Sequence, residues 1–475
     1  MTDHRRLGEV LLVGTVGSLL LALWALADRY PGHVPGTSPV EMASWVAGAL
    51  GVVALVWAWL RSRPLRGHRA LMVGAWTVPL LPVPPLLSLD AWAYAAQGWL
   101  LAHGMNPYLV PQGRAADLGL HVDAHWVATT AVYPPGSLWI QAAMTALAGY
   151  HPYWSTVAMR IPGLLALVLI GLAVTCLAQL AGADVDRVRW FTVANPLVLL
   201  HVVGGMHNDG LQCAVGLWAL VVGWTLARSG RSWAGLVAGG LLVGLAGTLK
   251  QPGVLFGLGL VALVHVEAVR SGRQRDGWGR LVLEALAGAL PAIGSFAAIS
   301  AIGGLGLGWL NDTAGSPASV TSDAPIALLV QIIGWTGVPV TSLVPAATAT
   351  SLVLTAAAII VCWVRWGPVP GRTGNPGRPA DPLLLQAGVL LAFALCGAGL
   401  QPWYLVGPLL LVAVTTFGSR RLTALTILTV AVVALSFLQW FSSPFLALPL
   451  VAVGTAMLWR PASDRLGAAD RPGAD

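Results

Sequence analysis

Short polar segments interrupt an otherwise apolar chain, and they hold the side chains whose types could do chemistry. Asp90 begins one segment, and a carboxylate held in a fixed position can act as a general base. His207 and Lys250, in two other segments, suit an anionic group such as a phosphate. Other polar and aromatic side chains of these segments suit contacts with the rest of a ligand: Tyr94, Gln97, Tyr133, Asn208, Asp209, Gln251, Gln401, Trp403 and Tyr404, with Trp92 as a weaker candidate.

Each of these residues also fits a purely structural role when it is taken alone. Asp90 could cap the helix that follows it, because an oxygen side chain there accepts a free backbone N–H. Lys250 could extend from a helix end to the membrane surface, and Trp403 could belong to an aromatic belt. Asn208 and Asp209 are residue types that turns favour. Only their joint placement can favour a site.

The composition indicates which class of protein must position these side chains. The chain has 475 residues, of which 56% are hydrophobic and 9% charged, and its mean hydropathy is +0.75. Soluble domains carry about 25% charged residues. The composition therefore excludes soluble enzymes, nucleic-acid binders and disordered proteins.

Apolar runs of membrane-spanning length predict an all-α polytopic membrane protein. A bilayer core needs about 20 apolar residues for each helix, which gives about 14 spans here. We expect residues 1–460 to form one polytopic domain and residues 461–475 a short cytoplasmic tail. The expected spans lie near 7–28, 42–60, 70–87, 158–181, 190–203, 211–227, 233–249, 253–269, 281–303, 338–364, 383–400, 403–418, 422–441 and 444–459.

The formal net charge of +7 could suggest an anionic partner, but the positions of the basic residues favour a topological role. Cytoplasmic loops hold most Lys and Arg residues. Alternating the spans from a cytoplasmic N-terminus places nearly all arginines inside and the long loop 88–133 outside. We interpret the apolar segment 134–150 as a helix that dips into the outer leaflet, although a true crossing with a later span miscounted stays open. Arg114 and Arg160 then lie outside.

All the polar segments fall on this outer side, and ionisable residues at membrane depth are costly and usually functional. The set suits transfer of a sugar from a lipid phosphate to a hydroxyl. Asp90 would be the base, and Lys250, His207, Arg160 and Arg114 would contact the phosphate. We predict no metal cofactor because no ligand spacing is diagnostic, although Asp90, Asp117, Asp123 and His207 leave a divalent ion open.

The segments around these residues resemble a known family. Asp90-Ala91-Trp92-Ala93-Tyr94-Ala95-Ala96-Gln97-Gly98, followed by Gly104-Met105-Asn106-Pro107-Tyr108, is similar to the first outer loop of the actinobacterial polyprenol-phosphate-mannose-dependent α-1,6-mannosyltransferases. The most specific match is Asn195-Pro196-Leu197-Val198-Leu199-Leu200-His201, which runs into Gly204-Gly205-Met206-His207-Asn208-Asp209. Lys250-Gln251-Pro252 and Gln401-Pro402-Trp403-Tyr404 also look similar.

The resemblance covers residues from about 85 to 410 and implies a C-type glycosyltransferase-like fold with a long first outer loop that carries the catalytic base. It implies transfer of mannose from a polyprenyl-phosphate carrier to a lipid-linked mannan in lipomannan and cell-envelope assembly. The α-1,6 linkage would form with inversion, and Asp90 would be the base. The enzyme would lie in the plasma membrane with its site on the outer face, and no nucleic acid would be involved.

One departure leaves the sugar open. Tyr133-Pro134-Pro135-Gly136 stands where the family more usually has Tyr-Gly-Pro-Leu, and the Pro-Pro form is similar to C-type enzymes that transfer other sugars, such as arabinose. The apolar spans would also suit a polytopic transporter or a scaffolding membrane protein. A transporter would place ionisable residues near the midplane and show an internal repeat, and no repeat is evident in this sequence.

Overall fold

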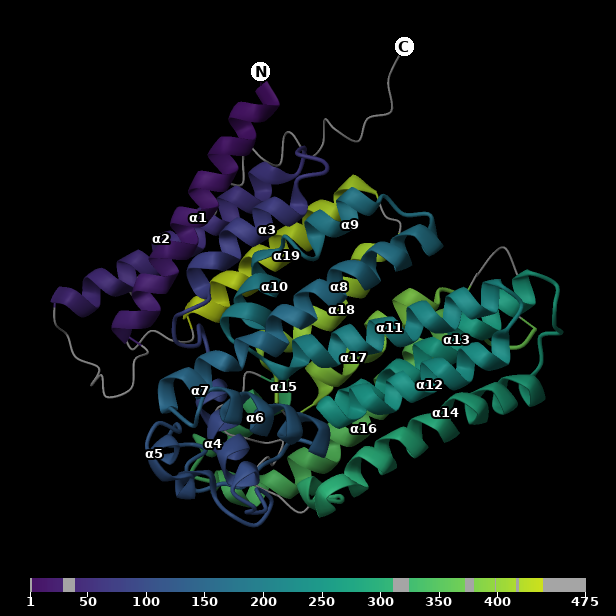
Figure 1. Cartoon of the computed structure of the whole chain (residues 1–475). Helices are drawn as coiled ribbons and strands as arrows, with labels where there is room; N and C mark the ends of the chain where they lie inside the picture. Colours follow the sequence, from purple (N-terminus) through teal and green to yellow (C-terminus); the bar gives the residue numbers. More distant parts are fainter. Residues whose placement is uncertain are drawn as a thin grey trace.

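The computed structural model describes residues 2–28, 39–310, 324–371, 380–397, 399–415 and 418–438 (Figure 1). Within these ranges the secondary structure is helical, and no strand is present. Nine helices among them are long and apolar enough to cross a membrane. The predicted all-α polytopic class is therefore confirmed. The expected span 444–459 and the tail 461–475 lie outside the described residues, as does the end of the span 422–441.

The helices follow one another along the chain with few long connections. Their bounds are α1 (Thr2–Asp28), α2 (Pro39–Ser62), α3 (Arg69–Thr77), α4 (Asp90–Ala102), α5 (Ala116–Gly119), α6 (Pro135–Leu147), α7 (Pro152–Ala158), α8 (Arg160–Ala181), α9 (Val185–Phe191), α10 (Pro196–Val198), α11 (Asn208–Arg228), α12 (Ser232–Leu249), α13 (Phe256–Arg270), α14 (Trp278–Ala301), α15 (Pro325–Gly334), α16 (Val340–Trp366), α17 (Pro382–Cys396), α18 (Val406–Val414) and α19 (Ser419–Leu438). Short 3₁₀ turns include η4 (Gln251–Leu255) and η7 (Pro402–Leu405), and η3 (Leu199–Gly204) is a π-helix.

The expected spans 383–400 and 403–418 correspond to apolar helices too short to count among the nine, Pro382–Cys396 and Pro402–Val414. Two further expected spans differ because proline and a π-helix interrupt them. In place of one helix over 70–87, α3 ends at Thr77 and a 3₁₀ turn over Val78–Leu80 follows it. The prolines at 79, 82, 84 and 85 cannot donate the backbone hydrogen bonds of a helix. In place of one helix over 190–203, α9, α10 and η3 follow in series.

The segment 134–150 forms the short helix α6, which packs against α4. Its 13 residues rise about 20 Å, which is less than the roughly 30 Å of a bilayer core. This length fits the interpretation that the segment dips into one leaflet without crossing. Figure 1 shows α4, α5, α6 and α7 gathered at one end of the helix bundle.

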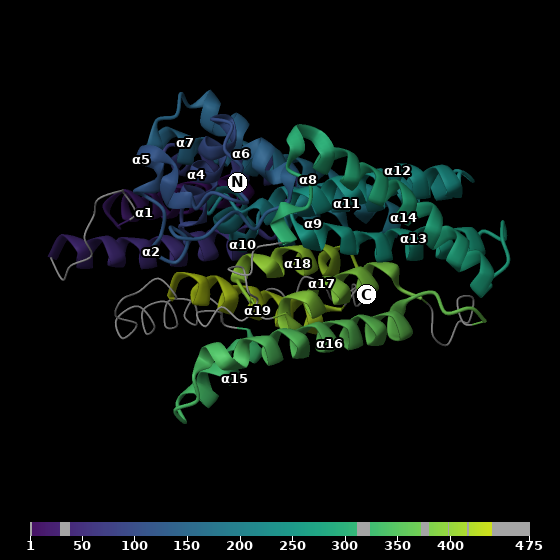
Figure 2. The same ribbon diagram turned by 90° about the horizontal axis from the view of Figure 1, so that it is seen from below.

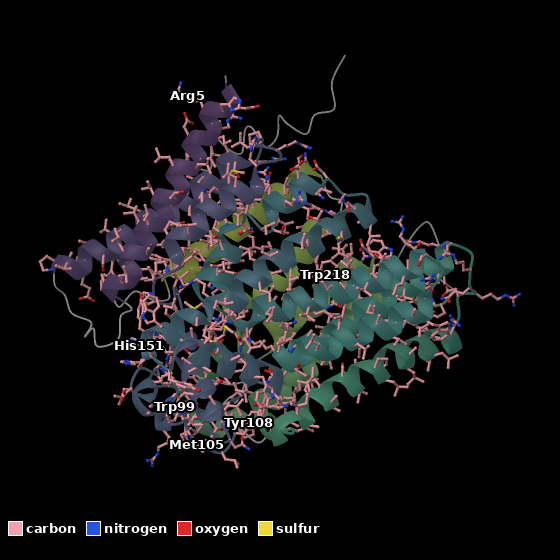
Figure 3. The ribbon with its side chains drawn as sticks, viewed as in Figure 1. Arg5, Trp99, Met105, Tyr108, His151 and Trp218 are labelled. Atoms are coloured by element: carbon pink, nitrogen blue, oxygen red, sulfur yellow. The ribbon has the colours of Figure 1, made fainter. Side chains whose placement is uncertain are left out.

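Segments expected inside the cell meet at the opposite end of the bundle. Arg66 pairs with Asp184 at 2.8 Å, and Arg273 donates to the carbonyls of Ala227 and Arg228. Figure 3 shows Arg5 at this end and Trp99, Met105 and Tyr108, from the expected outer loop, at the other. The described loops thus separate into the two sets that the arginine pattern predicts.

Close helix packing forms the core between these ends. Trp59 of α2 and Trp190 of α9 stack at 5.0 Å, and each indole donates to the backbone carbonyl of the other residue. Gly240 of α12 lets α14 approach, since a Cβ there would lie 2.3 Å from the carbonyl oxygen of Gly288. α14 and α16 bury only 11% of their most apolar windows, and Figure 2 shows α16 along the outer edge of the bundle. Their apolar surface is suited to lipid.

Candidate active site

Four of the polar segments come together at the end of the bundle that holds α4, α5, α6 and α7. Asp90 begins α4, His207 precedes α11, Lys250 follows α12, and Trp403 lies in η7. His207 contacts both Asp90 and Trp403, and Lys250 contacts Tyr404, the neighbour of Trp403. The structure therefore joins residues that the sequence separates by up to about three hundred positions.

The backbone before Asp90 lies beside the backbone before His207. The N–H of Leu86 donates to the carbonyl of Gly204 at 2.9 Å. Leu87 and Met206 have positive φ angles of 56° and 59°, which are unusual for residues with side chains. Such strain persists where the surrounding structure enforces it, often at functional sites. These two tight turns direct Asp90 and His207 toward the same space.

Arg160 ties these two backbone segments together. Its guanidinium donates to the carbonyls of Leu81, Val83 and Pro84 on one side and of Val203 and Gly204 on the other. The residue is only 2% exposed. Arg160 was predicted to contact a phosphate, but in this structure its guanidinium N–H groups are bonded to backbone carbonyls.

Asp90 is partly exposed, and one of its carboxylate oxygens collects its side-chain contacts. Oδ2 accepts from the hydroxyl of Tyr94 at 3.4 Å and lies 3.4 Å from Nδ1 of His207. Oδ1 has no partner among the described residues. Burial raises the pKa of Asp90, but the imidazole of His207, the charge of Lys250 and the Tyr94 hydroxyl outweigh it and hold this pKa below its ordinary value. A lowered pKa favours the ionised carboxylate, which is the form that can accept a proton.

Lys250 forms a buried ion pair with Asp209. Nζ lies 2.6 Å from Oδ2 of Asp209, and less than a tenth of either side chain is exposed. The ammonium also lies 4.5 Å from the ring centre of Tyr404 and 6.0 Å from that of Tyr133, a cation–π arrangement. Asp209 was predicted to contact a sugar, and here it is the counter-ion of the lysine.

His207 stacks on Trp403. Their ring centres are 3.6 Å apart and the planes are inclined by 15°. Neither ring nitrogen of His207 makes a hydrogen bond of good geometry with a described residue. The indole face that could stack on a sugar is thus covered by the imidazole.

The end of the loop 103–134 is fixed around Tyr133. Its hydroxyl lies 3.2 Å from that of Tyr94, and its carbonyl accepts from the Tyr108 hydroxyl at 2.7 Å. Gln251 donates to the carbonyl of Val132 at 2.7 Å. Burial, with Asp90 nearby, raises the pKa of the Tyr133 phenol, which stays neutral. Tyr94 and Tyr133 therefore connect the carboxylate of Asp90 to the surroundings of Lys250.

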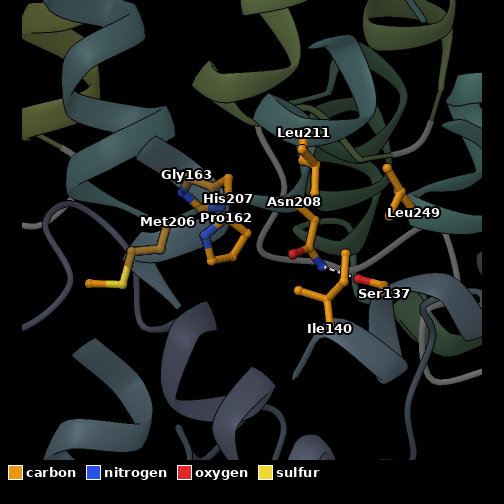
Figure 4. Close-up of a pocket in the computed structure, with 9 residues that line it drawn as sticks. All are labelled: Ser137, Ile140, Pro162, Gly163, Met206, His207, Asn208, Leu211 and Leu249. Carbon is orange, nitrogen blue, oxygen red and sulfur yellow. Dashed lines mark hydrogen bonds between the residues drawn. The ribbon is translucent and has the colours of Figure 1, made fainter. Parts of the chain in front are cut away.

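A pocket opens beside this cluster, between α6, α8, α11 and α12 (Figure 4). Asn208 donates to the hydroxyl of Ser137 at 2.7 Å across it. The lining residues are Ser137, Ile140, Pro162, Gly163, Met206, His207, Asn208, Leu211 and Leu249. The pocket thus places apolar side chains beside His207 and Asn208.

Three expected residues take no part in these contacts. Gln97 is buried on α4, and its Oε1 has no partner in the described part of the chain. Arg114 is exposed in the loop between α4 and α6, and Gln401 is half-buried just before η7. Neither of their side chains has a hydrogen bond or an ion pair with a described residue.

Sequence reasoning missed several residues that shape the site. His201, in the π-helix, is 1% exposed and lies 5.7 Å from the ring of Trp403. A histidine within an apolar run was a usable signal, because such placement is costly. Ser137 and the strained Leu87 and Met206 carried no signal, because their roles depend on chain segments that meet only in the fold.

The described residues contain no group of three or more His, Cys, Asp or Glu side chains that could hold a metal ion. Asp123 pairs with His125 at 2.7 Å. Asp117 is exposed on α5. Neither residue joins Asp90 and His207 in such a group.

Comparison with known proteins places this cluster in a family context. The family model described as "Alpha-(1->6)-mannopyranosyltransferase, N-terminal domain" matches residues 10–267, more than half of the chain. The chain is 36% identical over 301 residues to Alpha-(1->6)-mannopyranosyltransferase A of Mycobacterium tuberculosis, which covers 61% of this chain and 53% of that protein. It is 28% identical to Alpha-(1->6)-mannopyranosyltransferase B of Corynebacterium glutamicum, over 66% of this chain and 58% of that protein.

The chain thus spans just over half the length of these two relatives. It spans more of a third, from Mycolicibacterium smegmatis, named "Probable alpha-(1->6)-mannopyranosyltransferase", with 30% identity over 83% of this chain and 77% of that protein. Among solved structures, ArnT from Cupriavidus metallidurans bound to undecaprenyl phosphate overlaps 89% of this chain and 74% of its own, with 17% identity and a TM-score of 0.40, too weak to carry over any feature. The family match and the relatives confirm what the sequence motifs indicated: the chain belongs to the alpha-(1->6)-mannopyranosyltransferase family.

Proposed function

We propose that this protein is a membrane glycosyltransferase that moves mannose from a polyprenyl-phosphate carrier to a hydroxyl of a lipid-linked mannan. Membership of the mannopyranosyltransferase family supports this reaction class. The observation that carries the proposal is the carboxylate of Asp90, which begins α4 with Oδ1 free and Oδ2 contacted by His207 and Tyr94. A C-type glycosyltransferase-like arrangement, with the base at the start of the first long outer loop, is part of the same proposal.

The proposed reaction is a single displacement with inversion. Asp90 takes the proton from the acceptor hydroxyl as that oxygen bonds to the anomeric carbon of mannose. The bond between the anomeric carbon and the phosphate oxygen breaks, and its electron pair leaves with the polyprenyl phosphate. A β-linked donor gives an α-linked product, and an α-1,6 linkage follows from the family. No covalent intermediate on the protein is required.

Lys250 is the proposed contact for the donor phosphate, and His207, whose Nδ1 faces Asp90, would border that phosphate. Charge that develops on the leaving phosphate is stabilised best by cations already fixed in a low-dielectric site. Lys250 is fixed by Asp209 and by the faces of Tyr133 and Tyr404. Arg160 serves instead to position the two backbone segments, because its donors are bonded to carbonyls.

The sugar and acceptor would lie along the side chains that border Asp90. Tyr94 and Tyr133 present hydroxyl groups there, and Asn208 and Ser137 line the adjacent pocket. Gln97, Gln251, Gln401 and Tyr404 are further proposed contacts, and Arg114 is a proposed contact from the exposed part of the loop. The polyprenyl chain would extend into the bilayer.

The proposed site lies on the outer face of the plasma membrane, with both termini in the cytoplasm. Its support is the separation of the described loops into an arginine-rich end and the end that holds Asp90. A lipid-phosphate donor would supply activated sugar there without a nucleotide. We expect the product to enter lipomannan-type polymers of the cell envelope, and we expect activity to persist in EDTA.

The test is transfer of radiolabelled mannose from a polyprenyl phosphate to a mannan acceptor in membranes that contain the protein. Asp90→Asn should reduce transfer about 100- to 10,000-fold, the usual contribution of a general base. Asp117→Asn, an exposed acid on α5 of the same loop, is the matched control and should keep full activity. Full activity of Asp90→Asn would refute the proposal, and transfer of arabinose in place of mannose would correct the sugar.

A further inference from the structure

Trp403 and His207 form a parallel stack that leaves little freedom to either ring. Their centres are 3.6 Å apart, and both side chains are more than nine-tenths buried. The indole was expected to bind a sugar or acceptor, and such stacking needs an open ring face. The face toward His207 is not open.

Apart from the ring of His201, whose centre lies 5.8 Å away, the imidazole of His207 has few other contacts that could set its orientation. Its nitrogens make no hydrogen bond of good geometry within the described chain, and Nδ1 lies 3.4 Å from Oδ2 of Asp90. The other edge of the ring lies against Gly205, where an added Cβ would be 2.8 Å from Cδ2 and Nε2. Ring stacking and the backbone at Gly205 therefore hold the imidazole in place.

Asp90 is in turn oriented through one oxygen. Both His207 and Tyr94 approach Oδ2, at 3.4 Å each, and Oδ1 is left without a partner among described residues. Contacts of this length commonly shorten when substrate binds and excludes water. A carboxylate held in this way presents Oδ1 to an incoming hydroxyl.

We infer that Trp403 is a positioning residue: it holds His207 against Oδ2 of Asp90, so that Oδ1 is the atom that takes the acceptor proton. This inference rests on the proposed function. It adds that Trp403 holds His207 and that His207 in turn orients Asp90. Trp403 acts through His207 and needs no contact with sugar. Trp403, which the motif contributes, thus helps to position the catalytic base and does not form part of the acceptor surface.

Other groups around Asp90 also affect its titration. Lys250 and Tyr94 also lower the pKa of Asp90, and the charge of Asp90 in turn raises the pKa of the Tyr133 phenol. Asp209 faces Lys250 and weakens its effect. Trp403 also lies 5.7 Å from the ring of His201 and 6.1 Å from that of Tyr404. The double-mutant cycle with His207 is therefore the measurement that assigns the effect of Trp403 to His207.

A double-mutant cycle tests the inference with the full-length protein in membranes, under the same transfer assay. Trp403→Leu should lower kcat about 10- to 100-fold, the cost of a misplaced reacting group, with little change in the acceptor KM. His207→Gln should lower kcat to a similar extent. The double variant should be no slower than the worse single variant, because the two residues act in series.

The pH profile supplies a readout that a merely structural role would not move. His207 lowers the pKa of Asp90, so loss of its contact raises that pKa. The acid limb of kcat should therefore move to higher pH in both His207→Gln and Trp403→Leu. Trp403→Phe keeps a flat ring and should restore most of the rate and the wild-type limb.

Trp99 offers a matched control, since its indole stacks on His103 at 4.0 Å with an inclination of 25° at the far end of α4. Trp99→Leu should leave kcat and the acid limb unchanged. Multiplicative losses in the Trp403 and His207 cycle, or a raised acceptor KM at unchanged kcat, would overturn the inference. If Trp403→Leu does not fold, the pH profile of kcat for Trp403→Phe and the acid limb of kcat for His207→Gln test the inference instead. An active Asp90→Asn variant would instead refute the proposed function itself.

Discussion

Lys250 Nζ lies 2.6 Å from Oδ2 of Asp209, in a pair where less than a tenth of each side chain is exposed. Residues at the end of α12 and the start of α11 thus neutralise each other beside Asp90. Removal of one member of a buried pair leaves the other charge without compensation, which is usually worse than removal of both. Single and double variants of this pair can therefore distinguish a structural role of Lys250 from a chemical one.

We predict that Lys250→Met lowers stability by about 3–5 kcal/mol, because Asp209 is left buried and unpaired. Lys250→Met combined with Asp209→Leu should regain most of that stability but none of the transfer activity, since the phosphate contact is still absent. Thermal denaturation in detergent and transfer assays on the same samples measure both quantities. Recovery of activity in the double variant would show that Lys250 serves the fold alone.

The ionisation of Asp90 gives a prediction for pH dependence. Its pKa is held below the ordinary value, and activity requires the ionised form, so activity should be lost only as pH falls through this lowered pKa. Tyr94 helps to lower it, and Tyr94→Phe should therefore move the acid limb of kcat/KM to higher pH. Tyr108→Phe, which loses a bond to a carbonyl and not to the carboxylate, should leave that limb in place.

Gln251 connects the turn of Lys250 to the end of the loop between α4 and α6, through the carbonyl of Val132. Gln251→Glu keeps the size of the side chain but places a carboxylate against that carbonyl, so the loop end should detach. We expect kcat/KM to fall about tenfold and protease cleavage of the loop to quicken. Gln179→Glu, at an exposed position of α8, is the control. Equal behaviour of the two variants would argue against the connection.

Arg160 makes a prediction about folding. Five carbonyls accept from its guanidinium, and each buried acceptor left without a partner costs about 1–3 kcal/mol. Arg160→Lys keeps the charge but cannot reach both backbone segments, so we expect a lower denaturation temperature and a loss of folded protein. Wild-type stability of Arg160→Lys, with a raised KM for the donor, would restore its assignment to the phosphate.

Periodicity and composition determined much of this protein from the sequence. Long apolar runs predicted spans such as α1, α8 and α16, because a helix in lipid must satisfy its backbone internally. The arginine pattern predicted which loops share an end. The motifs at Asp90, His207 and Lys250 predicted the family and the segments of the site, since these signals are local.

The tertiary structure alone decided how those residues are used. It assigned Asp209 to Lys250, covered Trp403 with His207, and bonded Arg160 to the backbone rather than leaving it free for a ligand. These partners are far apart in the chain, and strained turns at Leu87 and Met206 and the π-helix before His207 bring them together. Residue type fixes which contacts a side chain can make, but only packing between distant segments selects the one that it makes.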